Sequence, residues 1–157
     1  MPSATLPRLR AYRASDGPFV EKLAKTAFGE YSPRAGPPSV RAATAPGTST
    51  AIALIGEKPV GFAMLTLHAA RRGSIASLDA IAVEPAHRGR GVGEALLANA
   101  ERSAKRRGAS ELRLVTAEAN VAALDLFLRS GFVIVERHTR YYPRGQNAVV
   151  MRKTLAP

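Results

Sequence analysis

A glycine-rich turn between a strand-like and a helix-like pattern constrains this chain more than any other feature. Residues 81–97 read IAVEPAHRGRGVGEALL, with Gly89, Gly91 and Gly93 in the turn. Because glycine has no Cβ, the backbone of such a turn can approach a ligand closely. The unpaired N–H groups of the first helical turn and the positive end of the helix dipole favour an anion, above all a pyrophosphate.

Two common phosphate-binding motifs do not fit this turn. A dinucleotide-binding fingerprint needs G-x-G-x-x-G in a first βαβ unit, whereas here the spacing is G-x-G-x-G in mid-chain. The P-loop string G-x-x-x-x-G-K-[ST] does not occur. A turn of this kind can also join a strand to a helix without binding anything. Taken alone, the turn predicts a strand–turn–helix unit and leaves both outcomes open.

The rest of the chain reads as short strands and amphipathic helices. Strands are expected at residues 9–14, 50–55, 60–68, 75–83, 112–116, 132–142 and 148–155, and helices at 18–28, 93–107 and 121–130, with one short helix inside 29–47. Asn120 is the expected cap of the helix at 121–130. Strands joined through helices of this length imply a mixed α/β sheet.

Composition excludes several classes of protein. The 157 residues are 46% hydrophobic, which fits one domain with a real core. The absence of cysteine excludes disulfides, thiolate nucleophiles and cysteine-ligated metal, and the three separate histidines argue against any metal site. No signal peptide and no apolar stretch of about 18 residues is visible, so we expect a cytoplasmic protein without a membrane span.

The net charge of +11 has two interpretations. It would attract an anionic ligand, yet an arginine-rich surface can equally reflect the composition of the source genome. A nucleic-acid-binding module is not expected, because no basic stripe with interleaved aromatic residues is visible.

Two motifs together resemble the GCN5-related N-acetyltransferase (GNAT) family. The first is Arg88-x-x-Gly91-x-Gly93, preceded by Val83-x-Pro85. The second follows 27 residues later, with Asn120, Ala123, Phe127, Gly131 and Phe132 at the family's spacing. The resemblance covers residues 74–155. It implies a single acetyltransferase domain over 1–157, a mostly antiparallel sheet of about seven strands with the fourth splayed from the fifth, and about four helices.

The same resemblance implies that acetyl-CoA is the co-substrate, without a metal. Its pantetheine would lie between the splayed strands and its pyrophosphate on the glycine-rich turn. The residues that this places at the cofactor are Ile81, Ala82, Val83, Arg88, Gly89, Arg90, Gly91, Val92, Gly93, Glu94, Asn120, Phe127 and Arg129. Two of these have a second interpretation, because Asn120 also caps a helix and Arg129 can equally be a surface arginine, whereas Phe127 would pack beside the thioester.

The string Arg140-Tyr141-Tyr142-Pro143, with residues 148–151 after it, is similar to the ends of protein N-terminal acetyltransferases, especially the ribosomal-protein alanine type. The positions of that group's glutamate base and tyrosine acid are Val115 and Phe127 here, and neither side chain can transfer a proton. Other groups must then act, or positioning alone.

Few side chains can replace the missing pair. Asp79 has the parity of Ser77, Ile81 and Val83 on its strand and could accept the amine proton, although it could equally be paired with an arginine. Glu118 and His68 are weaker alternatives. Tyr141 or Tyr142 is the preferred acid, and on a strand only one of the two would face a shared cleft.

We therefore expect an acetyl-CoA-dependent N-acetyltransferase that acts on a protein or peptide N-terminal α-amine. The alternatives are a small-molecule amine, such as an antibiotic or polyamine, and a non-catalytic acyl-CoA-binding module. The acceptor is set by the loops at residues 28–38 and 141–147, which the sequence does not decode. We expect a monomer or a homodimer.

Overall fold

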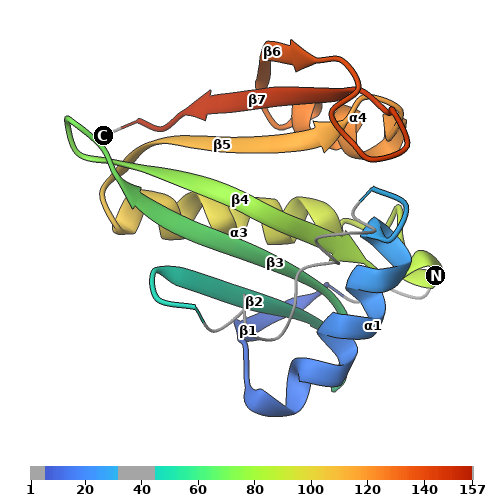
Figure 1. The fold of residues 1–157 in the computed structure, drawn as a ribbon. Coiled ribbons are helices and arrows are strands. Elements are labelled where there is room, and N and C mark those ends of the chain that lie inside the picture. Colours follow the sequence, from blue (N-terminus) through green and yellow to red (C-terminus); the bar gives the residue numbers. More distant parts are fainter. Residues whose placement is uncertain (1–5, 32–44, 157) are drawn as a thin grey trace.

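The computed structural model describes residues 6–31 and 45–156. Seven strands form one mixed sheet in the order β1-β2-β3-β4-β5-β7-β6 (Figure 1). Their bounds are β1 Arg8–Ala11, β2 Thr48–Ile55, β3 Lys58–Ala69, β4 Ser74–Val83, β5 Ala109–Ala117, β6 Val133–His138 and β7 Ala148–Thr154. All neighbouring strands are antiparallel except β4 and β5, which are parallel. The expected seven-stranded mixed sheet is thus confirmed.

Three α-helices are present among the described residues, against about four expected. They are α1 (Gly17–Phe28), α3 (Val92–Arg106) and α4 (Val121–Arg129), and short 3-10 turns span Ala14–Asp16 and Pro85–His87. The short helix expected inside 29–47 falls largely on residues 32–44, which lie outside the described part of the chain. The cap of α4 is confirmed, because the Asn120 side chain accepts a hydrogen bond from the Ala123 N–H.

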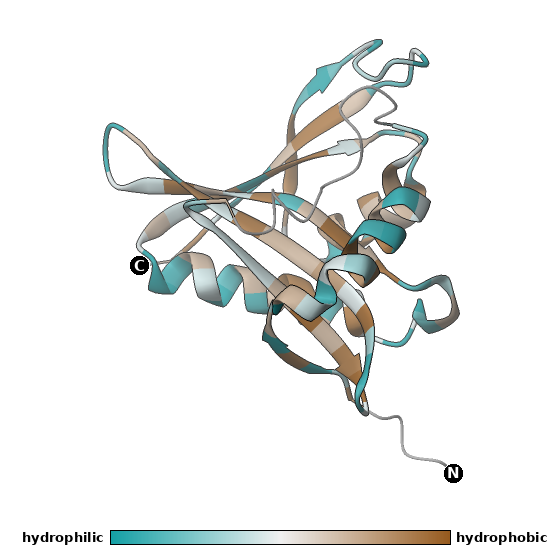
Figure 2. Cartoon of the chain, turned by 60° about the horizontal axis from the view of Figure 1, so that its bottom comes forward, coloured by the Kyte–Doolittle hydropathy of each residue, from teal (hydrophilic) through white to brown (hydrophobic). Residues whose placement is uncertain are grey.

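Two apolar clusters hold the helices against opposite faces of the sheet. The cluster under α3 includes Leu96, Leu97, Leu112 and Met151, and the cluster under α1 includes Phe62. Hydrophobic colour follows the strands, whereas hydrophilic colour recurs along the helices (Figure 2). The core therefore lies on both faces of β2, β3 and β4, as the apolar periodicity requires.

A nearly buried ion pair fixes the start of α1. The Arg10 guanidinium donates two hydrogen bonds to Asp16, of 2.7 and 2.9 Å, and the Arg13 N–H donates a third of 2.8 Å. The guanidinium of Arg10 holds the pKa of Asp16 below its ordinary value. Asp16 is only 3% exposed, so loss of either partner would leave a nearly buried charge unpaired at the start of α1.

The expected strand at 132–142 is too long. β6 ends at His138, and the chain turns before Tyr141 and Tyr142. The physical reason is Arg140, whose φ of +53° is left-handed and cannot continue a strand. Its N–H donates to Asn147 Oδ1 at 3.1 Å, which closes the loop. The two tyrosines consequently lie in the β6–β7 loop, and the alternation of a strand does not apply to them.

Candidate active site

The parallel strands β4 and β5 pair only at their first residues. Pairing runs from Ser74 opposite Ala109 to Ser77 opposite Arg113 and then stops. Beyond it β4 continues through Val83 and β5 through residue 117, and the two strands diverge toward the side where α4 lies (Figure 1). The expected splay of the fourth and fifth strands is confirmed, and it leaves an edge of β4 that β5 does not pair.

A β-bulge lies on β4 where the splay begins. Met64 of β3 is opposite Ala80 and Leu65 is opposite Leu78, so Asp79 is the extra residue. A bulge adds one residue to the alternation and changes which side chains share a face.

The expected parity of Asp79 with Ile81 and Val83 is therefore wrong. Ile81 and Val83 pack against the cluster under α3. Asp79 instead shares the α1 face with Ser77, as its hydrogen bonds show, while Ala80 belongs to the cluster under α1. The carboxylate is exposed on the side of the sheet where α1 lies.

Hydroxyl groups hold this carboxylate. Ser77 Oγ donates to Asp79 Oδ1 at 2.8 Å, and Thr66 Oγ1 donates to Oδ2. Behind them, His68 Nε2 lies 2.9 Å from Ser77 Oγ, and Thr48 Oγ1 lies 3.0 Å from Thr66 Oγ1. No arginine or lysine of residues 6–31 and 45–156 forms an ion pair with Asp79, so the alternative of a carboxylate paired with arginine finds no support there.

The glycine-rich turn leaves its backbone open at two positions. Gly89 and Gly91 have φ of +73° and +82°, and Gly91 is the N-cap of α3. A Cβ built on either residue would meet no atom within 4 Å. Both glycines are thus needed for backbone conformation, and the space beside them can admit a ligand. The Arg88 Nε donates to the Val83 carbonyl at 3.3 Å and ties the turn to the end of β4.

Gly93 also has a packing role that the sequence did not indicate. A Cβ there would lie 3.2 Å from Cδ2 of Leu126, so this glycine lets α4 pack closely against α3. Beside it, Arg129 of α4 donates to Glu94 at 3.2 Å and to Asp125 at 2.8 Å. The hydrogen bonds that Arg129 donates to Asp125 and Glu94 raise its pKa. Arg129 therefore links the two helices, and its side chain is 55% exposed.

The two positions at which the resemblance places a base and an acid differ in exposure. Phe127 is 3% exposed and packs edge-on against Phe132, with ring centroids 5.8 Å apart. Val115 is 45% exposed on β5. Glu118, which follows β5, accepts two hydrogen bonds from Arg137, and these lower its pKa. The positive charge of Arg137 makes this carboxylate a poorer base, and Asp79 has no such partner among the described residues, so Glu118 stays the weaker candidate.

The tyrosines of the β6–β7 loop belong to an aromatic cluster that the sequence did not reveal. Tyr142 lies 5.0 Å from Tyr141 and 5.2 Å from Tyr31, which follows α1, and Tyr141 lies 5.8 Å from His138 (ring centroids). Burial, and then its tyrosine neighbours, raises the pKa of Tyr142 to about 12. Tyr141 is 53% exposed. No sequence signal pairs Tyr31 with Tyr142, because 111 positions separate them.

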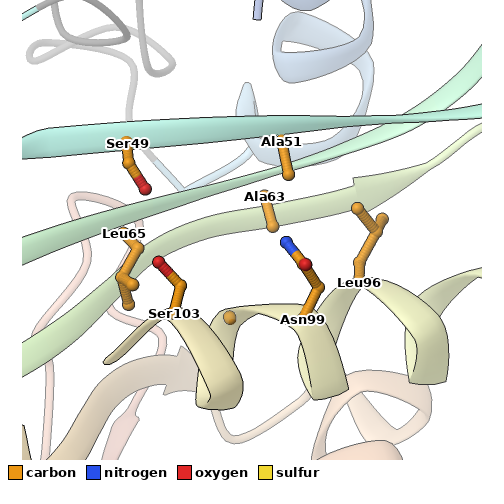
Figure 3. A pocket seen from close by; sticks show the side chains of 8 residues that line it. Ser49, Ala51, Ala63, Leu65, Leu96, Asn99 and Ser103 are labelled. Atoms are coloured by element: carbon orange, nitrogen blue, oxygen red, sulfur yellow. The ribbon is translucent and has the colours of Figure 1, made fainter. Parts of the chain in front are cut away.

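A small pocket elsewhere carries no such chemistry. It lies between α3 and strands β2 and β3, on the face opposite Asp79, and is lined by small and apolar side chains with Asn99 (Figure 3). It has no titratable group in its lining. Among the described residues, no group of three or more histidine, aspartate or glutamate side chains could hold a metal ion, and no helix is long and apolar enough to cross a membrane.

Comparison with known proteins agrees with this geometry. Three solved structures superpose on 96–97% of this chain and 96–99% of their own: Arabidopsis thaliana NAA60 in complex with acetyl-CoA (15% identity, TM-score 0.83), the ribosomal-protein-S18-alanine N-acetyltransferase from Escherichia coli (23%, 0.78) and nourseothricin acetyltransferase (25%, 0.77). No curated protein matches the sequence. The model of the acetyltransferase (GNAT) family matches residues 17–132, most of the chain. The chain therefore belongs to the GNAT family of acetyltransferases.

Proposed function

We propose that this acetyltransferase moves an acetyl group from acetyl-CoA to a protein or peptide N-terminal α-amine. The observation that carries the choice of acceptor is the lack of a strong base, since the positions expected to supply base and acid are Val115 and Phe127. A protein α-amine with a pKa of ~7.8 is already about 30% neutral near pH 7.4, whereas a lysine amine at ~10.4 is only about 0.1% neutral. An enzyme with little base catalysis fits the first acceptor.

The turn and the splayed strands fit acetyl-CoA, which supplies the acetyl thioester. The open backbone at Gly89 and Gly91, followed by the N–H groups at Val92, Gly93 and Glu94, suits a pyrophosphate. The edge of β4 that β5 does not pair, at Ile81, Ala82 and Val83, suits the amides of a pantetheine. Arg88, Arg90 and Arg129 add positive charge near these sites, while Asn120 and Phe127 keep the helix beside them in place.

Asp79 is the proposed acceptor of the amine proton. Its exposed carboxylate lies on the α1 face at the start of the splay, and two hydroxyls fix both of its oxygens. An ammonium group that approaches from this face would meet a negative charge in a protein of net charge +11. The gain should be largest below the pKa of the amine, where deprotonation limits the rate.

Tyr141 is the proposed proton donor to the departing thiolate. With a pKa of about 12, Tyr142 would give its proton to a CoA thiolate of pKa near ~8.5 only at a cost of about 5 kcal/mol. Tyr142 therefore serves to position Tyr141, whose ring it contacts edge-on. Solvent is the alternative proton source.

The test is turnover of acetyl-CoA with a panel of amines. Peptides with a free N-terminus are compared with the same peptides blocked at the N-terminus but carrying lysine, with polyamines and with the antibiotic nourseothricin. The protein has no cysteine, so a thiol reagent reports only the CoA released. We expect acetylated N-termini by mass spectrometry, and a rate that climbs with pH through ~7.8 and then levels.

Antibiotics are included in the panel because of one observation, the likeness to nourseothricin acetyltransferase at 25% identity. Acetylation of an antibiotic or polyamine but no peptide would replace the α-amine with a small-molecule acceptor. CoA binding without turnover of any amine would leave the non-catalytic module. Mass in solution decides between the proposed monomer and homodimer, and fractionation of cells tests the proposed cytoplasmic location.

A further inference from the structure

Two chains of side-chain hydrogen bonds, called arms below, end at the carboxylate of Asp79. One arm runs from His68 of β3 through Ser77 to Oδ1, in steps of 2.9 and 2.8 Å. The other runs from Thr48 of β2 through Thr66 to Oδ2. Three neighbouring strands thus contribute to the orientation of one exposed carboxylate.

The arms have a defined direction. A hydroxyl has one proton, and Ser77 gives its own to the carboxylate. Ser77 Oγ can therefore only accept from His68, so His68 Nε2 must carry a proton. The same reasoning makes Thr48 a donor to Thr66. His68 Nε2 is thus not free to act as a base.

We propose that His68 is a positioning residue for acetyl transfer, which acts through Ser77 to aim the Asp79 carboxylate at the incoming amine. The proposal rests on the proposed function. In the step itself, the amine nitrogen forms a bond to the acetyl carbon and the C–S bond breaks. The ammonium group loses one proton to Asp79 before the attack and a second to solvent after it, and the thiolate gains one from Tyr141 or solvent.

The position of Asp79 explains why it needs such support. The residue is the extra one of a bulge, so no side chain directly opposite it on β3 restrains it. Its side chain is also exposed, which leaves rotation free unless hydrogen bonds prevent it. Small errors in the placement of a catalytic group lower the rate even when the group is present.

The test is a set of substitutions in the full chain, measured as kcat and KM for the amine. His68→Ala and Ser77→Ala should each lower kcat about 5- to 20-fold, within the ~10²-fold that a general base supplies, and change KM less than twofold. Ser77→Thr should restore most of kcat, because it returns the hydroxyl. His68→Gln should keep much of kcat through its amide N–H. Ser110→Ala removes a serine hydroxyl at the start of β5, which belongs to neither arm, and should behave as wild type.

Double variants separate positioning from general packing. If His68 acts only through Ser77 and Asp79, then His68→Ala should not slow Ser77→Ala or Asp79→Asn any further. A further slowing by the same factor in the Asp79→Asn background would overturn the proposal, as would full activity of Ser77→Ala.

A measurement that does not depend on activity tests the role of His68 separately from the proposed function. Nitrogen–proton NMR of the wild-type protein above pH 8 should show neutral His68 with its proton on Nε2, and Ser77→Ala should change that signal. A proton on Nδ1 in the wild type would overturn the positioning role even if acetyl transfer is confirmed. Absence of turnover with every amine would instead overturn the proposed function.

Discussion

Replacement of Gly91 by alanine tests whether this glycine is needed for ligand binding or only for the stability of the fold. Gly91 has φ of +82°, and a Cβ there would meet no atom within 4 Å. Gly108, at the other end of α3, has φ of +85° and is equally open. The two positions lie roughly 25 Å apart along the helix. Gly108→Ala is therefore a matched control with the same strain and no part in the turn.

The cost to stability can be worked out for both variants. A left-handed backbone costs an L-residue about 1–2 kcal/mol, and the reduced freedom of the unfolded chain returns about 0.4–1 kcal/mol. Each variant should lose about 1 kcal/mol of unfolding free energy. In a domain of this length that lowers Tm by about 2–4 °C, which leaves both proteins folded at 25 °C.

The effect on binding should differ. A methyl group at Gly91 projects into the space proposed for the pyrophosphate and hinders backbone N–H groups from reaching it. One hydrogen bond to a charged oxygen contributes about 1.5–3 kcal/mol, so its loss weakens binding about 10- to 100-fold. Calorimetric titration with CoA at 25 °C should show this loss for Gly91→Ala and wild-type affinity for Gly108→Ala.

Two results would refute the reasoning. Wild-type affinity in Gly91→Ala, together with the expected fall in Tm, would mean that the turn does not contact the ligand. Equal loss of affinity in both variants would mean that the effect comes from destabilisation, and the open space at Gly91 would then have no bearing on CoA.

The remaining predictions concern the start of α1 and the tyrosine pair. Asp16→Asn leaves Arg10 without its nearly buried partner and should cost about 3 kcal/mol, a fall in Tm of about 6–12 °C by calorimetry. Because Arg10 lowers the folded-state pKa of Asp16, this contribution is complete above the unfolded value of ~3.9 and is lost as the pH falls through the folded value. The Tm gap between wild type and variant should therefore close on acidification below about pH 4, and a gap that persists there would contradict the assignment. Tyr141→Phe should lower kcat at saturating acetyl-CoA, whereas Tyr142→Phe should change it less; equal, wild-type-like rates would leave solvent as the proton source.

Much of the fold could be predicted because its signals are local. The glycine that ends α3 and the asparagine that caps α4 are residues whose own chemistry fixes the backbone, and both were placed correctly. The splay of β4 from β5 was predicted only through the resemblance to the family. No local signal in either strand reports where their pairing stops.

The bulge at Asp79 could not be predicted, because β4 is apolar in both parities beyond it. Ala80, Ile81, Ala82 and Val83 all fit a buried face, so a shift of one residue leaves the hydrophobic pattern intact. The early end of β6 could not be predicted either, because it depends on the backbone conformation of a single residue. Arginine rarely adopts a left-handed backbone, and nothing nearby indicates that Arg140 does so.

The same bulge explains how one strand can serve two sides of a site. Beyond Asp79, β4 buries Ala80 and Ala82 under α1, while Ile81 packs against the cluster on the α3 side. With both faces covered, the hydrogen-bonding capacity that remains lies along the edge turned toward β5, where pairing has stopped. A ligand with its own amides can satisfy such an edge, whereas an apolar ligand would leave it unpaired. The bulge itself keeps Asp79 on the α1 face, so a strand with this shift can bind one substrate along its edge and present a carboxylate to another.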